Sequence, residues 1–173
     1  MKIFCKHDLS ESAEIIVDAA FELSQRQYGA LIVIVRETGI RTYIESGELL
    51  EAKLSKALLT SIFFPKSSMH DGAVIVKGDV VEAARCTLPL SATTQVDGEN
   101  LGMRHRAGLG ISEQADVISV IVSEETGGIS MAENGKLTSG LSKDSLRKKL
   151  EEAIITPTPK GWKALFEQFK GNK

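Results

Sequence analysis

The stretch Ala30-Leu31-Ile32-Val33-Ile34-Val35 contains only apolar residues, and most of them are β-branched. A short run of this kind after a glycine is typical of a strand that is covered on both faces of a sheet. It is also the longest uninterrupted apolar run of the chain, far below the roughly 20 residues that a membrane helix needs. The stretch therefore predicts an interior strand of a folded domain.

Helical and strand patterns alternate on both sides of this strand. Apolar residues recur at helical spacing before it, with Ser10 as the expected cap. Gly78-Asp79 and Asn134-Gly135 indicate hairpin turns, and the polar region Pro89 to Asn100 indicates a loop. This alternation predicts an α/β protein. The predicted helices cover 11–27, 52–63, 103–115 and 142–155, and the predicted further strands cover 73–77, 80–88, 117–122 and 129–132.

A chain of 173 residues with a net charge of -2 fits one domain with a balanced surface. This balance argues against a protein that coats nucleic acid through a basic face. Cys5 and Cys86 have neither metal-binding nor redox spacing, so reduced thiols and a cytoplasmic location are expected. We expect one folded domain over 1–155, because Thr156-Pro157-Thr158-Pro159 ends the last helix, and a tail over 156–173 that could form a short amphipathic helix.

Two arginines and a histidine stand in a row at Arg104-His105-Arg106, near the start of the helix predicted over 103–115. A guanidinium offers a planar fork of donors that suits phosphate oxygens, and the free N–H groups of a helix start would add to an anion site. Arg104 and Arg106 differ by about 200° around a helix axis, so they cannot both grip one phosphate group. Either Arg106 is structural and paired with a carboxylate, or the two arginines address ligands on different sides.

Carboxylates lie at two further strand ends, in His70-Asp71-Gly72 and Ser123-Glu124-Glu125. Ligands bind at strand ends in sheets flanked by helices, and Mg²⁺ or Mn²⁺ takes one or two carboxylates together with phosphate oxygens. Because side chains alternate along a strand, Glu125 is favoured over Glu124 beside Ser123, unless a turn begins at Ser123. Taken singly, each cluster is also compatible with a turn, a solvated surface or a salt-bridged helix face. The P-loop and Rossmann signatures are absent from the sequence.

Asp71-Gly72-Ala73 followed about thirty residues later by Arg104-His105-Arg106 resembles the paired signature of the diadenylate cyclase family. This family condenses two ATP into cyclic di-AMP and releases two pyrophosphates. The chain looks most like the membrane-tethered type, whose catalytic domain follows transmembrane helices absent from this sequence. The resemblance implies a mixed central sheet flanked by helices. It covers roughly Ser12 to Glu152 and extends through Gly29–Val33, Leu88–Ser91 and Ser123–Gly128.

The resemblance also implies roles for individual residues. Asp71 would serve the metal and the attacking 3′-hydroxyl, and Arg104 and His105 would serve the phosphates. Many relatives have threonine where this chain has Met103, and often tyrosine against the base where it has Thr87, so ATP affinity is expected to change more than activity. The implied catalytic residues are Asp71, Gly72, Arg104 and His105; the ATP-binding residues are Gly72, Ala73, Thr87, Leu88, Met103, Arg104, His105, Ser123 and Glu124; and the metal ligands are Asp71, His70 and Glu125.

The reaction itself sets further expectations. An aspartate with a pKa of about 3.9 is a poor base for an alcohol, whose acidity is nearer that of water at roughly 15.7, so a divalent metal (Mn²⁺, Mg²⁺ or Co²⁺) is needed. Each 3′-hydroxyl must attack the α-phosphate of the other ATP, which requires two sites facing each other in a head-to-head homodimer. ATP and a second copy are therefore the expected partners. Nucleic acid is not, and membrane contact is expected only through an N-terminal anchor absent from this chain.

Two other functions are compatible with the same residues. One is a regulatory module that binds a nucleotide without turning it over, with Met103 and Thr87 as signs of lost activity. The other is a metal-dependent nucleotide hydrolase. The products of an incubation with ATP and metal distinguish the three.

Overall fold

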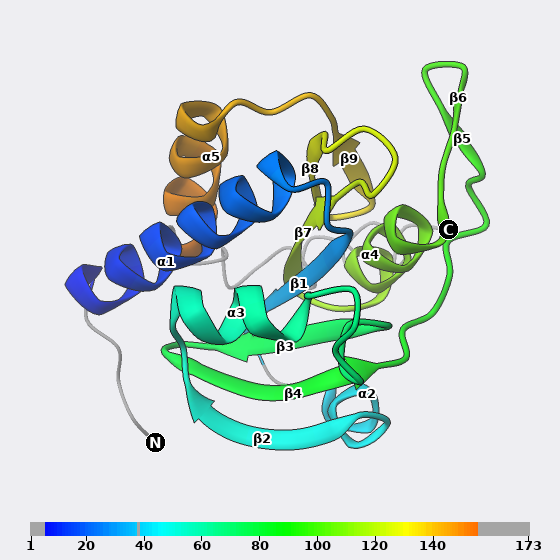
Figure 1. The fold of residues 1–173 in the computed structure, drawn as a ribbon. Helices are drawn as coiled ribbons and strands as arrows, with labels where there is room; N and C mark the ends of the chain where they lie inside the picture. Colours follow the sequence, from blue (N-terminus) through cyan, green and yellow to red (C-terminus); the bar gives the residue numbers. More distant parts are fainter. Residues whose placement is uncertain (1–5, 38, 156–173) are drawn as a thin grey trace, which may run out of the picture.

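The computed structural model describes residues 6–37 and 39–155, which form a mixed sheet with helices on both faces (Figure 1). The predicted α/β fold with a mixed central sheet is confirmed. The sheet strands are β1 (Ala30–Val35), β2 (Glu48–Lys53), β3 (Ala73–Lys77), β4 (Val80–Cys86), β7 (Val117–Val122), β8 (Ile129–Glu133) and β9 (Lys136–Thr138), in the order β2-β4-β3-β1-β7-β8-β9. The helices are α1 (Lys6–Gln25), α2 (Arg41–Glu45), α3 (Lys56–Ile62), α4 (Met103–Gln114) and α5 (Lys143–Ile155).

Strand β1 lies in the middle of the sheet, and every one of its residues is buried. It runs parallel to β3, with Ile32 opposite Val74, and antiparallel to β7, with Ala30 opposite Val122. Its alternate side chains enter two separate cores, because successive residues of a strand point to opposite faces. The prediction of a strand covered on both faces is confirmed.

The two cores belong to different helix layers. Helices α1, α3 and α5 cover one face of the sheet, while α4 and the short α2 cover the other (Figure 1). Helix α4 comes close to the sheet at Gly108 and to the loop at Pro89–Ser91 at Gly110, because neither glycine has a side chain. A β-carbon on Gly108 would lie 3.0 Å from the Ile121 side chain, and one on Gly110 would clash with the Pro89 carbonyl. The helical propensity that these glycines cost is therefore offset by close packing.

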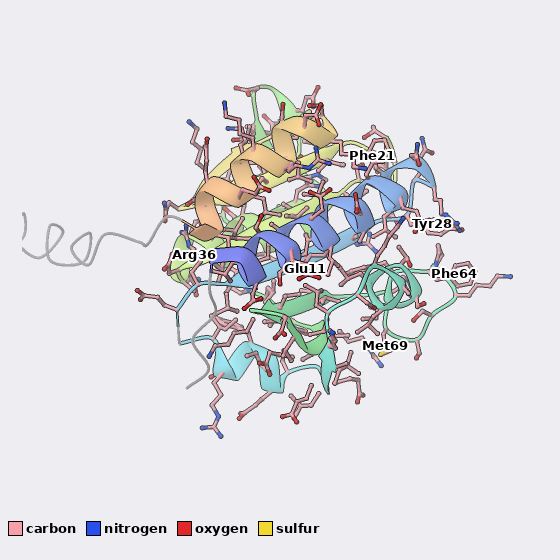
Figure 2. The ribbon with its side chains drawn as sticks, turned by 90° about the vertical axis from the view of Figure 1, so that its left-hand side faces the viewer. Glu11, Phe21, Tyr28, Arg36, Phe64 and Met69 are labelled. Carbon is pink, nitrogen blue, oxygen red and sulfur yellow. The ribbon has the colours of Figure 1, made fainter. Side chains whose placement is uncertain are left out.

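An ion cluster lies at the end of β1 that is remote from Tyr28 (Figure 2). Arg36 Nη2 lies 2.6 Å from Asp116 Oδ1, and Arg36 Nη1 lies 2.7 Å from Glu133 Oε1. Arg36 Nη1 also donates to the Ala153 carbonyl at 3.2 Å. One mostly buried guanidinium thus joins β1, β7, β8 and the last turn of α5.

Several helix boundaries predicted from the sequence were wrong. Helix α1 begins at Lys6 rather than Glu11, and Ser10 does not cap it but donates from its Oγ to Glu151 at 3.5 Å. The helix predicted over 52–63 begins only at Lys56, because Ser55 caps it by accepting from the Leu58 N–H. Residues 48–53 instead form the edge strand β2, which the sequence analysis missed.

Strand β2 lacks a clear apolar pattern because it is mostly exposed and is interrupted by a bulge, with a left-handed φ of 48° at Glu51. The loop predicted between Pro89 and Asn100 contains a short hairpin, β5 (Gln95–Val96) and β6 (Glu99–Asn100), that projects from the fold (Figure 1). Both differences concern exposed segments, where periodicity is a weak signal.

The predictions for the ends of the chain are tested only in part. Within residues 6–37 and 39–155, no helix is long and apolar enough to cross a membrane. Cys86 is a buried free thiol, and burial raises its pKa to about 11, as suits the small core residue that was expected. The tail over 156–173 and Cys5 lie outside the described residues, so the domain division stays a prediction.

Candidate active site

Four neighbouring strands bring the predicted site segments to one end of the sheet. Strands β1 and β3 begin there, and the antiparallel β4 and β7 end there. The segment 70–72 leads into β3, Thr87-Leu88 follows β4, and Ser123-Glu124-Glu125 follows β7. Helix α4 presents Arg104 and His105 in its first turn and packs on β1 and β7. Residues more than 50 positions apart thus meet because of strand pairing.

Gly72 holds the Asp71 loop against the end of β4. Its φ is +120°, which side chains disfavour, and a β-carbon would lie 2.8 Å from the Arg85 backbone. Arg85 itself has a left-handed φ of 55° at an irregularity in the β3–β4 pairing. Asp71 is exposed at this tight junction, while His70 Nδ1 lies 2.7 Å from the Ser67 carbonyl.

Arg104 forms an ion pair across the site. Its Nη1 lies 3.3 Å from Glu124 Oε2, and its side chain is 22% exposed. The buried Nε has no hydrogen-bond partner among the described residues. The guanidinium lies against the backbone of Gly29, which the sequence analysis did not single out for this role. Arg104 is therefore held mainly by packing, with part of its donor fork accessible to a ligand.

The segment after β7 is a tight turn rather than a continuation of the strand. Ser123 Oγ accepts from the N–H groups of Glu125 (3.2 Å) and Thr126 (3.3 Å), and the Gly127 N–H donates to the Ser123 carbonyl at 2.9 Å. Because the turn begins at Ser123, strand alternation does not choose between the two glutamates. In the structure Glu124 pairs with Arg104, and Glu125 is exposed.

Arg106 is turned away from this ion pair, as helix geometry predicted. Its Nε and Nη2 donate to the Ser91 carbonyl at 3.2 and 3.1 Å. The Ser91 N–H in turn donates to the Arg106 carbonyl at 2.9 Å. Arg106 therefore ties the loop before β5 to α4. Its partner is a backbone carbonyl and not the expected carboxylate.

The Thr87-Leu88 segment is positioned by Ser46, a residue that the sequence analysis passed over. The Thr87 N–H donates to Ser46 Oγ at 2.9 Å, while the Thr87 side chain is exposed and Leu88 is buried. Met103 is 64% exposed at the start of α4. A nucleotide base placed beside Thr87 would find a fixed backbone rather than an aromatic ring.

Residues 17–137 match the family model DAC, described as the DisA bacterial checkpoint controller nucleotide-binding domain. The chain belongs to the DAC family. It is 45% identical over 97% of its length to a diadenylate cyclase of Listeria monocytogenes serotype 1/2a (strain 10403S), and 48% identical over 82% of its length to the cyclic di-AMP synthase CdaA of Bacillus subtilis (strain 168). A crystal structure of a DacA double mutant from Staphylococcus aureus superimposes with a TM-score of 0.79 at 40% identity, covering 87% of this chain and 97% of that one. The chain spans 60% and 51% of the lengths of the two curated relatives.

The side chains of the DAC domain fit a metal site that is completed by phosphate oxygens better than one formed by protein ligands alone. In residues 6–37 and 39–155, no group of three or more His, Cys, Asp or Glu side chains is placed to hold a metal. Asp71 precedes β3 and Glu125 follows β7, with β1 between them, so their strands are about 10 Å apart. One or two carboxylates plus substrate phosphates is the usual Mg²⁺ arrangement, and this donor set fits it. The ligand set of His70, Asp71 and Glu125 stays a prediction.

His105 is expected to make the stability of the DAC domain depend on pH. Burial lowers its pKa from the ordinary 6.5, the Arg104 charge lowers it further, and Glu125 opposes this shift. The unfolded chain therefore binds a proton more readily than the folded one, so stability decreases as the pH falls through about 6.5. Urea unfolding at pH 7.5 and 5.5 should show a smaller loss for His105→Gln than for the wild type. An equal loss in both proteins would contradict this assignment.

Proposed function

We propose that this DAC domain is a diadenylate cyclase that condenses two ATP into cyclic di-AMP and releases two pyrophosphates. The observation that carries the proposal is the meeting of the Asp71-Gly72 loop, the Arg104-His105 turn and the Ser123 turn at one end of four strands. The family membership and the names of the relatives support the same reaction.

In this proposal each segment contacts a different part of ATP. Arg104 and His105 bind phosphate oxygens, assisted by the free N–H groups at the start of α4. Ser123 and Glu124 border the phosphates from the turn after β7, where Glu124 pairs with Arg104. Gly72, Ala73, Thr87, Leu88 and Met103 enclose the nucleoside. The turn formed by Ser123 keeps these groups fixed before ATP arrives, which lowers the cost of orienting the substrate.

Asp71 orients the attacking 3′-hydroxyl and would hold a divalent metal that it shares with the phosphates, with His70 and Glu125 as the other predicted donors. When bound, Mn²⁺, Mg²⁺ or Co²⁺ would neutralise phosphate charge and make the hydroxyl more acidic. The oxygen of each 3′-hydroxyl forms a bond to the α-phosphorus of the other ATP. The bond from that phosphorus to the β-phosphate oxygen breaks, and pyrophosphate leaves as the hydroxyl proton is released.

Both attacks require a second copy of the domain. A single chain holds one ATP, so two sites must face each other across a two-fold axis, as in a head-to-head homodimer. The exposed apolar side chains of Met103 (64%), at the start of α4, and Leu90 (43%), in the loop beside Gly110, support a contact through α4 and this loop. Membrane attachment, implied by the likeness to the tethered type, would have to come from outside the described residues.

The proposal predicts one cyclic di-AMP and two pyrophosphates for every two ATP consumed in the presence of Mn²⁺ or Mg²⁺. Below the dissociation constant of the dimer, the rate per mole of protein should about double when the protein concentration doubles, because only dimers react. Chromatography of the products over a protein dilution series measures both quantities. Bound ATP with no turnover in either metal would indicate the regulatory module, and ADP or AMP as sole nucleotide product the hydrolase.

A further inference from the structure

We propose that Gly29 is a positioning residue for the phosphate site: its bare backbone is the surface on which the Arg104 guanidinium lies. A β-carbon at position 29 would lie 2.6 Å from Arg104 Nη1, 2.8 Å from Cζ and 3.2 Å from Nε. Any side chain there would force the guanidinium away from its place opposite Glu124. The inference rests on the proposed function for its effect on ATP, but the contact itself does not.

The contact with Arg104 explains why position 29 is a glycine, although its backbone conformation does not require one. Gly29 does not have a positive φ, so an L-amino acid could adopt its backbone conformation. It is buried, and the nearest atoms to a β-carbon all belong to the Arg104 side chain. The missing side chain at position 29 thus serves this one neighbour.

Arg104 would yield to such a side chain more readily than the fold would. Its guanidinium is the far end of a flexible side chain, whereas Gly29 leads directly into the central strand β1. The ion pair with Glu124 at 3.3 Å is the one polar contact of the Arg104 side chain among the described residues, and Glu124 is 65% exposed. This ion pair is weak because its Glu124 side lies mostly in solvent, so losing it costs little stability, while the group that would bind phosphate is displaced.

The same junction between α1 and β1 also supports the opposite half of the ion pair. Ser24 Oγ donates to the Gly127 carbonyl, within the turn that carries Glu124. Gly127 has a φ of +75°, and a β-carbon there would lie 2.6 Å from the Ser24 carbonyl. Residues 24–29 therefore set the position of Arg104 relative to the turn from both sides.

Gly29→Ala is expected to weaken ATP binding by about 10- to 100-fold, the worth of a charge-assisted hydrogen bond, while thermal stability changes little. Gly98→Ala is the control, because a β-carbon there would meet nothing within 4 Å and the residue lies in the turn between β5 and β6, away from the site. It should change affinity by no more than about 3-fold. Titration calorimetry with ATP and Mg²⁺ measures both. Equal affinities for Gly29→Ala and the wild type would overturn the proposal.

A double-mutant cycle tests whether the effect passes through Arg104. In an Arg104→Ala background, Gly29→Ala should cause no further loss of affinity, because no guanidinium is left to displace. If Gly29→Ala alone fails to fold, the double variant should fold. A second full loss of affinity in the double variant, or its failure to fold, would overturn the proposal.

The NMR signal of the Arg104 side chain supplies a readout that does not depend on ATP. Because Nε is buried, its N–H should exchange slowly with water in the wild type. The signal, assigned by its loss in Arg104→Ala, should shift and exchange faster in Gly29→Ala but not in Gly98→Ala. An unchanged signal in Gly29→Ala would contradict the inference. Failure of the wild type to make cyclic di-AMP would instead refute the proposed function and leave this comparison valid.

Discussion

Asp71→Asn is expected to reduce cyclic di-AMP formation by roughly 10³-fold or more, the order of loss when a catalytic group is removed. Asparagine keeps the shape of the side chain but lacks the negative charge that a divalent cation and the attacking hydroxyl require. Asp71 is exposed, and the structure shows no hydrogen bond or ion pair between it and other described residues. Stability should therefore change by no more than about 0.5 kcal/mol.

Asp97→Asn provides a matched control for this experiment. Asp97-Gly98 is another exposed Asp-Gly pair, but it forms the turn between β5 and β6, away from the four strand ends of the site. It should keep wild-type turnover. Product formation with ATP and Mn²⁺, together with thermal melting, measures both variants. Wild-type turnover by Asp71→Asn would remove Asp71 from the mechanism.

Arg36→Met is expected to lower the free energy of unfolding by about 3–5 kcal/mol, because Asp116 and Glu133 would lose the cation that they share. The side chains of Arg36 and Asp116 are only 12% and 10% exposed. A loss of this size corresponds to a fall in melting temperature of about 10 °C for a chain of this length. Urea unfolding measures the change, and activity per folded molecule should remain, since the cluster lies at the opposite end of β1 from the site.

Arg41→Met is the matched control for the ion cluster. Arg41 Nε lies 2.9 Å from Glu45 Oε1, but these side chains are 89% and 57% exposed. Breaking this pair should cost no more than about 1 kcal/mol, because solvent screens exposed charges. Similar losses of stability in the two variants would show that burial does not govern the strength of the Arg36 cluster.

Much of the fold could be predicted because its signals are local. The central strand, the β3–β4 hairpin turn at Gly78-Asp79 and the strand over 117–122 follow from short apolar runs between glycine-containing turns. The exposed strand β2 was missed, since a mostly solvated edge strand with a bulge has no regular alternation. The early start of α1 was missed because Ser10, a good cap by type, contacts α5 instead.

The candidate site could be predicted only as separate motifs. Helix periodicity alone separated Arg104 from Arg106, and the structure gives them different neighbours. The choice between Glu124 and Glu125 failed to follow from the sequence, because a turn begins at Ser123. No pattern in the sequence indicated that Ser46 fixes Thr87, since the two meet only across the sheet edge.

The sequence by itself determined the chemical groups available to this protein: carboxylates, a row of cations and the strands that carry them. These properties depend on residue types and on spacings of a few residues. The tertiary structure decided which of these groups meet, because contacts such as Arg104 with Gly29 and Glu124 join three separate segments. Such contacts depend on strand order, register and the close approach of α4 to the sheet, none of which is encoded in one local stretch.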